Sequence, residues 1–156
     1  MNPTPVFRRA RPEEAPALSA IALASKQTWG YPDEWLAAWR ADLTLSPEYV
    51  RDRPVWVAEA EGATAGFLGL DRRAGAWHFE HLWLRPAFIG QGLGRGLFAE
   101  AVRLARAAGA SELQIRSDPH AESFYLKMGA VRTGLEVYQL LGKIPREVPH
   151  LSYSIR

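Results

Sequence analysis

The segment Leu84–Phe98 reads LRPAFIGQGLGRGLF and carries glycine at four alternate positions, 90, 92, 94 and 96. It follows an apolar run typical of a strand and precedes a pattern typical of a helix. Glycine permits a positive φ and lets backbone amides approach a ligand closely. The first amides of a helix lack intrahelical acceptors and lie at the positive end of its dipole. The segment therefore predicts a turn that binds a phosphate or pyrophosphate group.

Two common nucleotide-binding motifs do not fit this segment. A Walker loop requires Gly-Lys followed by Ser or Thr, whereas here Gly94 is followed by Arg95 and Gly96. A dinucleotide fingerprint requires glycines spaced two and then three residues apart. Counted from Gly90 and Gly92, the third glycine would fall on Arg95. Both motifs are therefore excluded.

The glycine segment resembles the acyl-coenzyme A binding turn of the GNAT superfamily of N-acetyltransferases. The family pattern is Arg or Gln, two residues, Gly, any residue, then Gly or Ala. In the preferred register Ile89 takes the first position, Gly92 the fourth and Gly94 the sixth. A second register, beginning at Gln91, restores the usual first residue but shifts the glycines against the helix start. Because Ile89 departs from the pattern, backbone amides would provide nearly all of the phosphate binding.

A second segment resembles a later motif of the same family. Residues 117–134 read SDPHAESFYLKMGAVRTG, with a helix cap at Asp118, a Phe-Tyr pair and a turn at Gly129. His120 stands where the family often has Asn, and Ala130 replaces the usual aromatic residue. The two motifs occur in the family's order, and the resemblance covers the chain from Val6 to Ile155.

The resemblance implies an α/β (α+β) fold, with a GNAT-like mixed, mostly antiparallel central sheet of about seven strands flanked by about four helices. It also implies a single domain over residues 1–156, a length that suffices for one core. Residue patterns alone favour α/β or α+β without choosing between them.

Apolar periodicity and turn residues predict where the elements lie. Strands are expected at Val6–Ala10, Val55–Ala60, Thr64–Asp71, Ala76–Leu84, Leu113–Arg116, Val131–Gln139 and Pro149–Ile155, with a loop at Gly142–Glu147. Helices are expected to begin at Arg11 and Ser46 and to cover Asp33–Leu43, Gly92–Ala108 and Pro119–Met128.

Amide formation from a thioester requires a neutral amine, donors for the oxyanion and a proton for the leaving thiolate. The resemblance implies that Tyr125, of the Phe-Tyr pair, faces the cofactor sulfur and protonates it; the alternative is a core tyrosine. It also implies that Glu80 is the base, directly or through water. A salt-bridged surface glutamate is the alternative there, and His78 or His81 could replace it as base.

Strand alternation assigns the residues around Glu80 to two faces. It predicts that His78, Glu80, Leu82 and Leu84 share one face, and that His81 and Trp83 lie on the other.

The resemblance also implies which residues bind the cofactor. The strand before the glycine turn separates from the next strand in this family, and its exposed amides bind the pantetheine arm and the acyl carbonyl. The cofactor-binding residues implied are Leu82, Trp83, Leu84, Ile89, Gly90, Gln91, Gly92, Leu93, Gly94, Arg95, His120 and Phe124.

An aromatic segment between the first two helices is a candidate wall of the acceptor pocket. It contains Trp29 and Tyr31, and His78 is a further candidate substrate residue. Aromatic rings there would suit a flat amine or hold a cation. Hydrophobic packing onto the sheet is the alternative explanation.

Composition excludes some classes of function. The chain has no cysteine, which excludes disulfides and thiolate chemistry. Its 19 basic and 17 acidic residues are dispersed and give a net charge of +2, so we expect no nucleic-acid partner. No apolar stretch is long enough to span a bilayer, so we expect no membrane partner and a cytoplasmic location.

The leading hypothesis is an acyl-CoA-dependent N-acetyltransferase that uses acetyl-CoA as co-substrate and acts on a primary amine of a small molecule or peptide. The alternative is a non-catalytic module that senses acyl-CoA, and the presence of Tyr125 and Glu80 favours catalysis. His78 and Glu80 have the spacing of two metal ligands without a defined third, so we expect no metal. A homodimer is possible, because relatives often dimerise.

Overall fold

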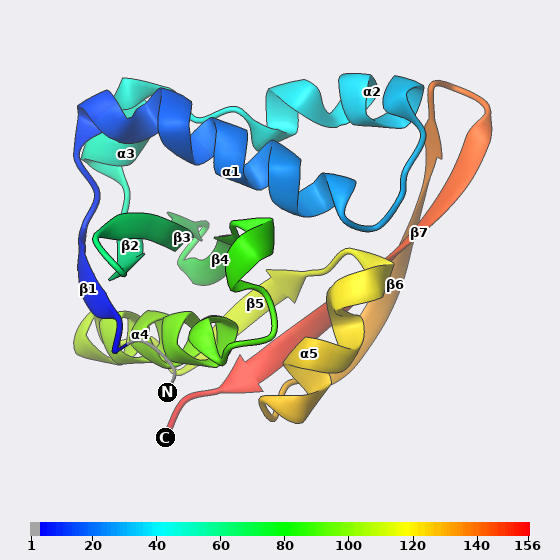
Figure 1. Cartoon of the computed structure of the whole chain (residues 1–156). Helices are drawn as coiled ribbons and strands as arrows, with labels where there is room; N and C mark the ends of the chain where they lie inside the picture. Colours follow the sequence, from blue (N-terminus) through cyan, green and yellow to red (C-terminus); the bar gives the residue numbers. More distant parts are fainter. Residues whose placement is uncertain (1–3) are drawn as a thin grey trace.

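The computed structural model describes residues 4–156 and contains a seven-stranded sheet (Figure 1). The strand order is β1-β2-β3-β4-β5-β7-β6; β4 and β5 pair in parallel and the other neighbours are antiparallel. The strands are β1 (Val6–Arg9), β2 (Val55–Ala60), β3 (Ala63–Arg73), β4 (Ala76–Leu84), β5 (Glu112–Arg116), β6 (Val131–Leu140) and β7 (Ile144–Ser154). This mixed, mostly antiparallel sheet confirms the predicted fold class.

Helices cover both faces of the sheet. Figure 1 shows α1, α2 and α3 on one face and α4 and α5 on the other. The helices are α1 (Ala15–Gln27), α2 (Asp33–Leu43), α3 (Pro47–Asp52), α4 (Leu93–Ala107) and α5 (Glu122–Lys127), with 3-10 turns at Pro12–Glu14, Pro86–Phe88 and Pro119–Ala121. The prediction of a helix at Asp33–Leu43 is confirmed, and the helix after the glycine turn differs from its prediction by one residue at each end.

Each face of the sheet has its own apolar core, because successive strand residues point to opposite faces. Val55, Val57 and Phe67 pack with residues of α1 and α2 in the first core. Leu68 and Leu70 pack with α4 in the second core. The sheet is therefore packed between two layers of helices.

Strand β4 contains a bulge at Glu80. Gly69 of β3 pairs with His81, whereas the next residue, Leu70, pairs with Phe79. Glu80 is therefore an additional residue that has no partner in the β3 ladder. A bulge of this kind interrupts the regular alternation of side chains.

Leu82 and Leu84 share one face of β4 and Trp83 lies on the other, as predicted, but the bulge makes the predicted face of Glu80 wrong. Leu82 and Leu84 pack against the core beneath α4, whereas Trp83 packs against the core beneath α1 and α2. Glu80 accepts a hydrogen bond from Tyr49 of α3, so it lies on the face of Trp83 and not on that of Leu82. The extra residue shifts the alternation by one position.

Strands β4 and β5 separate after a short stretch of pairing. Their parallel ladder joins Trp77, His78 and Phe79 of β4 to residues 113–115 of β5 and continues no further. Residues 81–84 of β4 still pair with β3 on the other side. The β5-facing backbone of this part of β4 is therefore left outside the sheet ladder, as the family resemblance predicts.

The last two strands are longer than predicted, and the predicted loop at Gly142–Glu147 is wrong. Ile144 pairs with Leu140, and Arg146 with Tyr138, so β7 begins directly after a tight turn. A proline at position 145 suggests a loop, because proline cannot donate to a ladder. Pairing between β7 and β5 begins only at residue 150. At position 145 the β5-facing edge of β7 therefore needs no backbone donor, and a proline is tolerated there.

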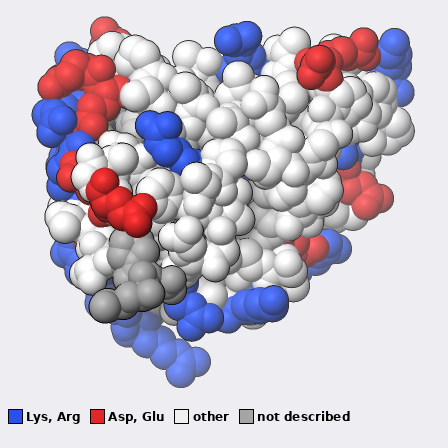
Figure 2. Space-filling model, viewed as in Figure 1, with Lys and Arg blue, Asp and Glu red and all other residues white. Residues whose placement is uncertain are grey.

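Charged side chains are dispersed over the molecular surface. Figure 2 shows Lys and Arg mainly around the rim of the viewed face, interspersed with Asp and Glu. The centre of this face, where Figure 1 places the β4–α4 turn and α5, is largely uncharged. Within residues 4–156, no helix has the length and apolar character needed to cross a membrane.

Candidate active site

A cavity of about 570 Å³ lies where β4 and β5 separate. On the β4 side it is lined by Phe79, Glu80, His81, Leu82 and Trp83, and on the opposite side by Ser117, Asp118, Pro119, Ala121 and Tyr125. Helices α1 and α2 and the β6–β7 hairpin complete its walls. The bulge and the short β4–β5 ladder therefore create this cavity.

The glycine turn leads into helix α4 in a conformation suited to an anionic ligand. Gly92 has a φ of 84° and is the N-cap residue, a conformation that other residues adopt only with strain. The first amide bonded within the helix is that of Gly96, which donates to the Gly92 carbonyl at 3.2 Å. The preceding amides of residues 93–95 have no helical acceptor and are available to a phosphate.

The turn is packed against other residues predicted to bind the cofactor. A Cβ atom added to Gly94 would lie 3.3 Å from Phe124 and 3.8 Å from Leu84, so glycine permits this close approach. Ile89 is 48% exposed, and Gln91 donates a hydrogen bond to the carbonyl of Ala87 at 3.2 Å. Neither side chain takes part in the contact that closes the turn against α5.

Tyr125 is buried in the wall of the cavity. It belongs to α5, is 8% exposed, and packs against Phe79 and Phe98. Burial raises the pKa of its phenol above the ordinary value near 10. At neutral pH Tyr125 is therefore protonated and can donate a proton.

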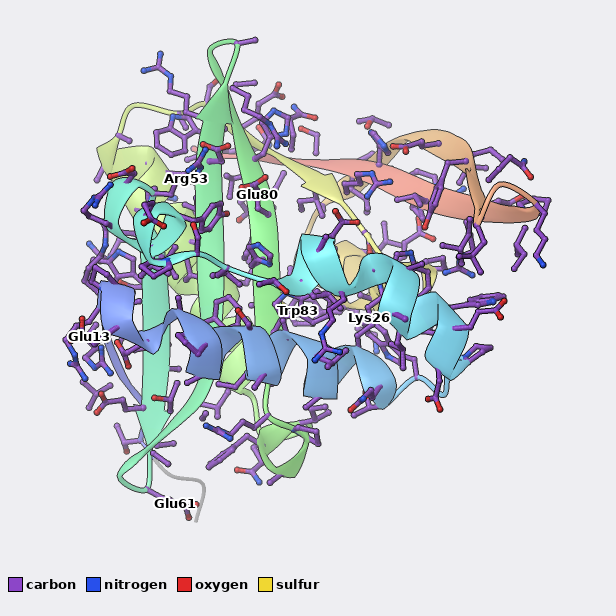
Figure 3. All side chains as sticks on the ribbon, turned by 90° about the horizontal axis from the view of Figure 1, so that it is seen from above. Glu13, Lys26, Arg53, Glu61, Glu80 and Trp83 are labelled. Carbon is purple, nitrogen blue, oxygen red and sulfur yellow. The ribbon has the colours of Figure 1, made fainter. Side chains whose placement is uncertain are left out.

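Glu80 lines the same cavity with its carboxylate held by two donors. Tyr49 donates to Oε1 at 2.6 Å and Arg73 donates to Oε2 at 2.8 Å, and the side chain is 19% exposed. Figure 3 shows Glu80 on β4 beyond Trp83, toward Arg53. The carboxylate is therefore held by polar partners, one from α3 and one from β3. Burial raises the pKa of Tyr49, which keeps it a donor.

The two histidines of β4 differ in position. His81 lines the cavity, and burial lowers its pKa to about 4. Its Nδ1 accepts a hydrogen bond from Trp83 at 3.0 Å, so the proton of the neutral ring is assigned to Nε2. His78 pairs with Asp71 of β3 and does not line the cavity. One nitrogen of His81 already accepts a hydrogen bond and burial disfavours protonation of the ring, so His81 is poorly suited to act as a base.

Asp118 connects the end of β5 to helix α1. Its side chain is 6% exposed and accepts hydrogen bonds from the Tyr31 hydroxyl at 3.0 Å and the His120 amide at 2.9 Å. Lys26 lies 3.4 Å away, and burial lowers the pKa of its ammonium while Asp118 opposes that shift. The predicted helix cap at Asp118 is confirmed, and the same carboxylate also organises the cavity wall.

The aromatic segment forms a cluster around two cations of the protein itself. Lys26 lies 4.0 Å from the centroid of Trp39, and the Arg146 guanidinium carbon lies 5.0 Å from that of Tyr31. Trp29 lines the cavity and stacks on His120 with centroids 5.4 Å apart. The ring faces proposed to hold a substrate cation are therefore partly covered by Lys26 and Arg146.

The structure brings six residues singled out from the sequence together around the cavity: Trp29, Glu80, His81, Leu82, Trp83 and Tyr125. Sequence analysis did not assign to the site Tyr49, which donates to Glu80, or the lining residues Trp39, Arg116, Glu136, Tyr138 and Arg146. Most of these come from α2, α3 or the final hairpin, so no local motif joins them to β4. Among residues 4–156 no group of three or more His, Asp or Glu side chains is placed to hold a metal.

The chain is similar to known acetyltransferases. A family model described as "Acetyltransferase (GNAT) domain" matches residues 25–140. Peptidyl-lysine N-acetyltransferase YjaB of Salmonella typhimurium is 32% identical over 139 residues, which cover 88% of this chain and 90% of that protein.

Solved structures share the fold. A GCN5-related N-acetyltransferase from Rhodopseudomonas palustris matches with a TM-score of 0.82 at 24% identity, over 99% of this chain and 98% of that one. YncA, a putative acetyltransferase from Salmonella typhimurium solved with acetyl-CoA, matches with a TM-score of 0.71 at 19% identity, over 98% of this chain and 95% of that one.

Proposed function

Because the chain belongs to the GNAT family of acetyltransferases, we propose that it transfers an acetyl group from acetyl-CoA to a primary amine in a ternary complex. The observation that carries the proposal is the gap between β4 and β5, which opens into a cavity lined by both Glu80 and Tyr125. An acyl carbonyl placed in this gap would lie between a candidate base and a candidate acid.

The glycine turn would hold the diphosphate of the coenzyme. The amides of residues 93–95 supply donors at the positive end of α4, and Gly92 gives the turn its left-handed conformation. Phe124 and Leu84 support the turn from behind. The unpaired edge of β4 at Leu82–Leu84 would provide backbone donors to the pantetheine arm and to the carbonyl oxygen.

Glu80 would remove the proton from the attacking amine through a water molecule. Both of its carboxylate oxygens already accept hydrogen bonds, from Tyr49 and Arg73, and this fixes the side chain at the cavity wall. A carboxylate oxygen retains a second lone pair that a water can use. Tyr49 and Arg73 would therefore act as positioning residues for Glu80.

Tyr125 would protonate the leaving thiolate. In the transfer, the amine nitrogen forms a bond to the carbonyl carbon and the C–S bond breaks. The amine proton passes to Glu80, and the thiolate takes the phenol proton of Tyr125. Burial keeps this phenol protonated at neutral pH, so the proton is present for transfer to the thiolate.

A free-thiol assay with acetyl-CoA and a panel of amines tests the proposal. The panel includes lysyl peptides, because a relative is named as a peptidyl-lysine N-acetyltransferase. Tyr125→Phe should lower kcat by about 10²- to 10⁴-fold, since general acid catalysis contributes on that order. Tyr153→Phe is the matched control, because Tyr153 packs on Phe98 and does not line the cavity.

Two results would contradict this assignment. Unchanged kcat in Tyr125→Phe would remove Tyr125 from the mechanism. Coenzyme A binding by calorimetry without thiol release from any amine would favour the sensor alternative over an enzyme.

A further inference from the structure

Arg146 enters the cavity from β7 and lies among aromatic rings. Its guanidinium carbon is 5.0 Å, 5.2 Å and 5.4 Å from the ring centroids of Tyr31, Trp35 and Trp39. One of its terminal nitrogens donates to the Tyr31 hydroxyl at 2.9 Å. The buried Nε atom has no hydrogen-bond partner among the described residues.

Three of the four carboxylates that line the cavity are engaged with cations, and the fourth, Asp42 of α2, forms no ion pair among the described residues. Glu136 pairs with Arg116, Asp118 with Lys26, and Glu80 with Arg73. Within residues 4–156, no carboxylate lies within 4.0 Å of Arg146. Arg146 is thus a cation of the cavity wall that lacks a charged partner.

A second cation lies close to Arg146. Lys26 and Arg146 both approach the ring of Trp39, at 4.0 Å and 5.4 Å from its centroid. Asp118 forms an ion pair with Lys26 and accepts a hydrogen bond from the Tyr31 hydroxyl. Arg146 in turn donates a hydrogen bond to that hydroxyl. Lys26 is thus paired directly with Asp118, whereas Arg146 is connected to it only through the Tyr31 hydroxyl. The positive charges of Lys26 and Arg146 disfavour a substrate ammonium here and favour an anion.

We propose that Arg146 binds a carboxylate of the acceptor, so that the acceptor is an amino acid that presents its amine toward Glu80. A guanidinium offers parallel N–H groups that match the two oxygens of a carboxylate. Arg146 lines the cavity, and the surrounding aromatic rings would shield such a pair from water. This inference rests on the proposed N-acetyltransferase function and specifies its substrate class.

The wild-type enzyme tests this inference with matched pairs of acceptors. Glycine, β-alanine and γ-aminobutyrate are compared with their carboxamides, which keep the amine and lack the negative charge. At least one acid should have a kcat/KM roughly 10- to 100-fold above that of its amide, the range for a hydrogen bond to a charged group. Amides or lysyl peptides used as well as the acids, or better, would overturn the inference.

Variants of Arg146 give a second test. Arg146→Met keeps an apolar side chain packed against the rings but removes the charge. The ratio of kcat/KM for an acid to kcat/KM for its amide should then fall to roughly one. Arg146→Lys should retain part of the preference for acids, because lysine keeps the positive charge but lacks the parallel N–H donors of a guanidinium. Arg72→Met, an exposed arginine of β3 outside this cavity, is the matched control. An unchanged ratio in Arg146→Met would overturn the inference.

A binding measurement separates this inference from the proposed function. Calorimetry with the preferred acid and its amide, in the presence of coenzyme A, requires no turnover. Tighter binding of the acid in the wild type, lost in Arg146→Met, supports the carboxylate site even if no thiol is released. Thiol release from neutral amines, with no preference for acids in either assay, supports the enzyme and refutes the site.

Discussion

The buried histidine of β4 makes a quantitative prediction about stability. Burial lowers the pKa of His81 to about 4, whereas an exposed histidine in the unfolded chain has a pKa near 6.5. Between these values the unfolded chain binds a proton that the folded protein does not. Stability therefore falls as the pH is lowered from about 6.5 toward 4, and His81 contributes no pH dependence above that window.

The size of the effect follows from the two pKa values. The full shift of about 2.5 units corresponds to about 3 kcal/mol of unfolding free energy. Between pH 7 and pH 5, His81 lowers the free energy of unfolding by about 2 kcal/mol, because about 1.5 of the pH units between the two pKa values lie above pH 5. His78, whose pKa is also lowered by burial, adds a loss in the same direction.

Urea unfolding at pH 7 and pH 5 measures this loss in the wild type and in His81→Gln. A glutamine side chain can accept from Trp83 as His81 does, and it does not titrate. The loss between pH 7 and pH 5 should be about 2 kcal/mol smaller in His81→Gln than in the wild type. His78→Gln is the control for the other histidine of β4. Equal losses in the wild type and His81→Gln would refute the account of His81 as a buried neutral ring.

Two other predictions concern the reaction. Glu80→Gln should lower kcat by about 10²- to 10⁴-fold while coenzyme A affinity measured by calorimetry stays the same, and a kcat near that of the wild type would exclude Glu80 as the base. Gly92→Ala should lower stability by about 1–2 kcal/mol and weaken coenzyme A binding, because alanine is strained at a φ of 84°. Gly134→Ala is the control, because Gly134 lies in β6 and a Cβ atom there would meet open space. Equal coenzyme A affinities in Gly92→Ala and Gly134→Ala would show that the turn does not bind the cofactor.

Local patterns were sufficient to predict most elements and the glycine turn. Helix α2 and strands β2 and β4 have the predicted bounds, because short-range periodicity and nearby turn residues determine them. The positive φ of Gly92 and the cap at Asp118 are likewise local properties of the chain. These features locate the turn and the α5 motif without knowledge of the tertiary structure.

Long-range pairing explains what the sequence did not predict. The bulge at Glu80 depends on how β4 meets β3, and strand alternation alone places Glu80 on the face of Leu82. Tyr49 of α3 reaches Glu80, and Arg146 of β7 reaches the cavity, from elements that lie far from β4 in the sequence. Arg146 falls within the predicted loop at Gly142–Glu147, whereas in the structure it belongs to β7.

One inserted residue in β4 connects the chemistry of this cavity with its shape. A bulge increases local twist and ends regular pairing, and here the β4–β5 ladder stops at Phe79, directly before the bulge. The same insertion turns Glu80 and Trp83 toward α1–α3 and Leu82 toward α4. Glu80 and Arg146 consequently lie on one side of β4, the side on which we propose that the acceptor binds. The glycine turn and Tyr125 lie on the side of α4 and α5, which suits the acyl donor.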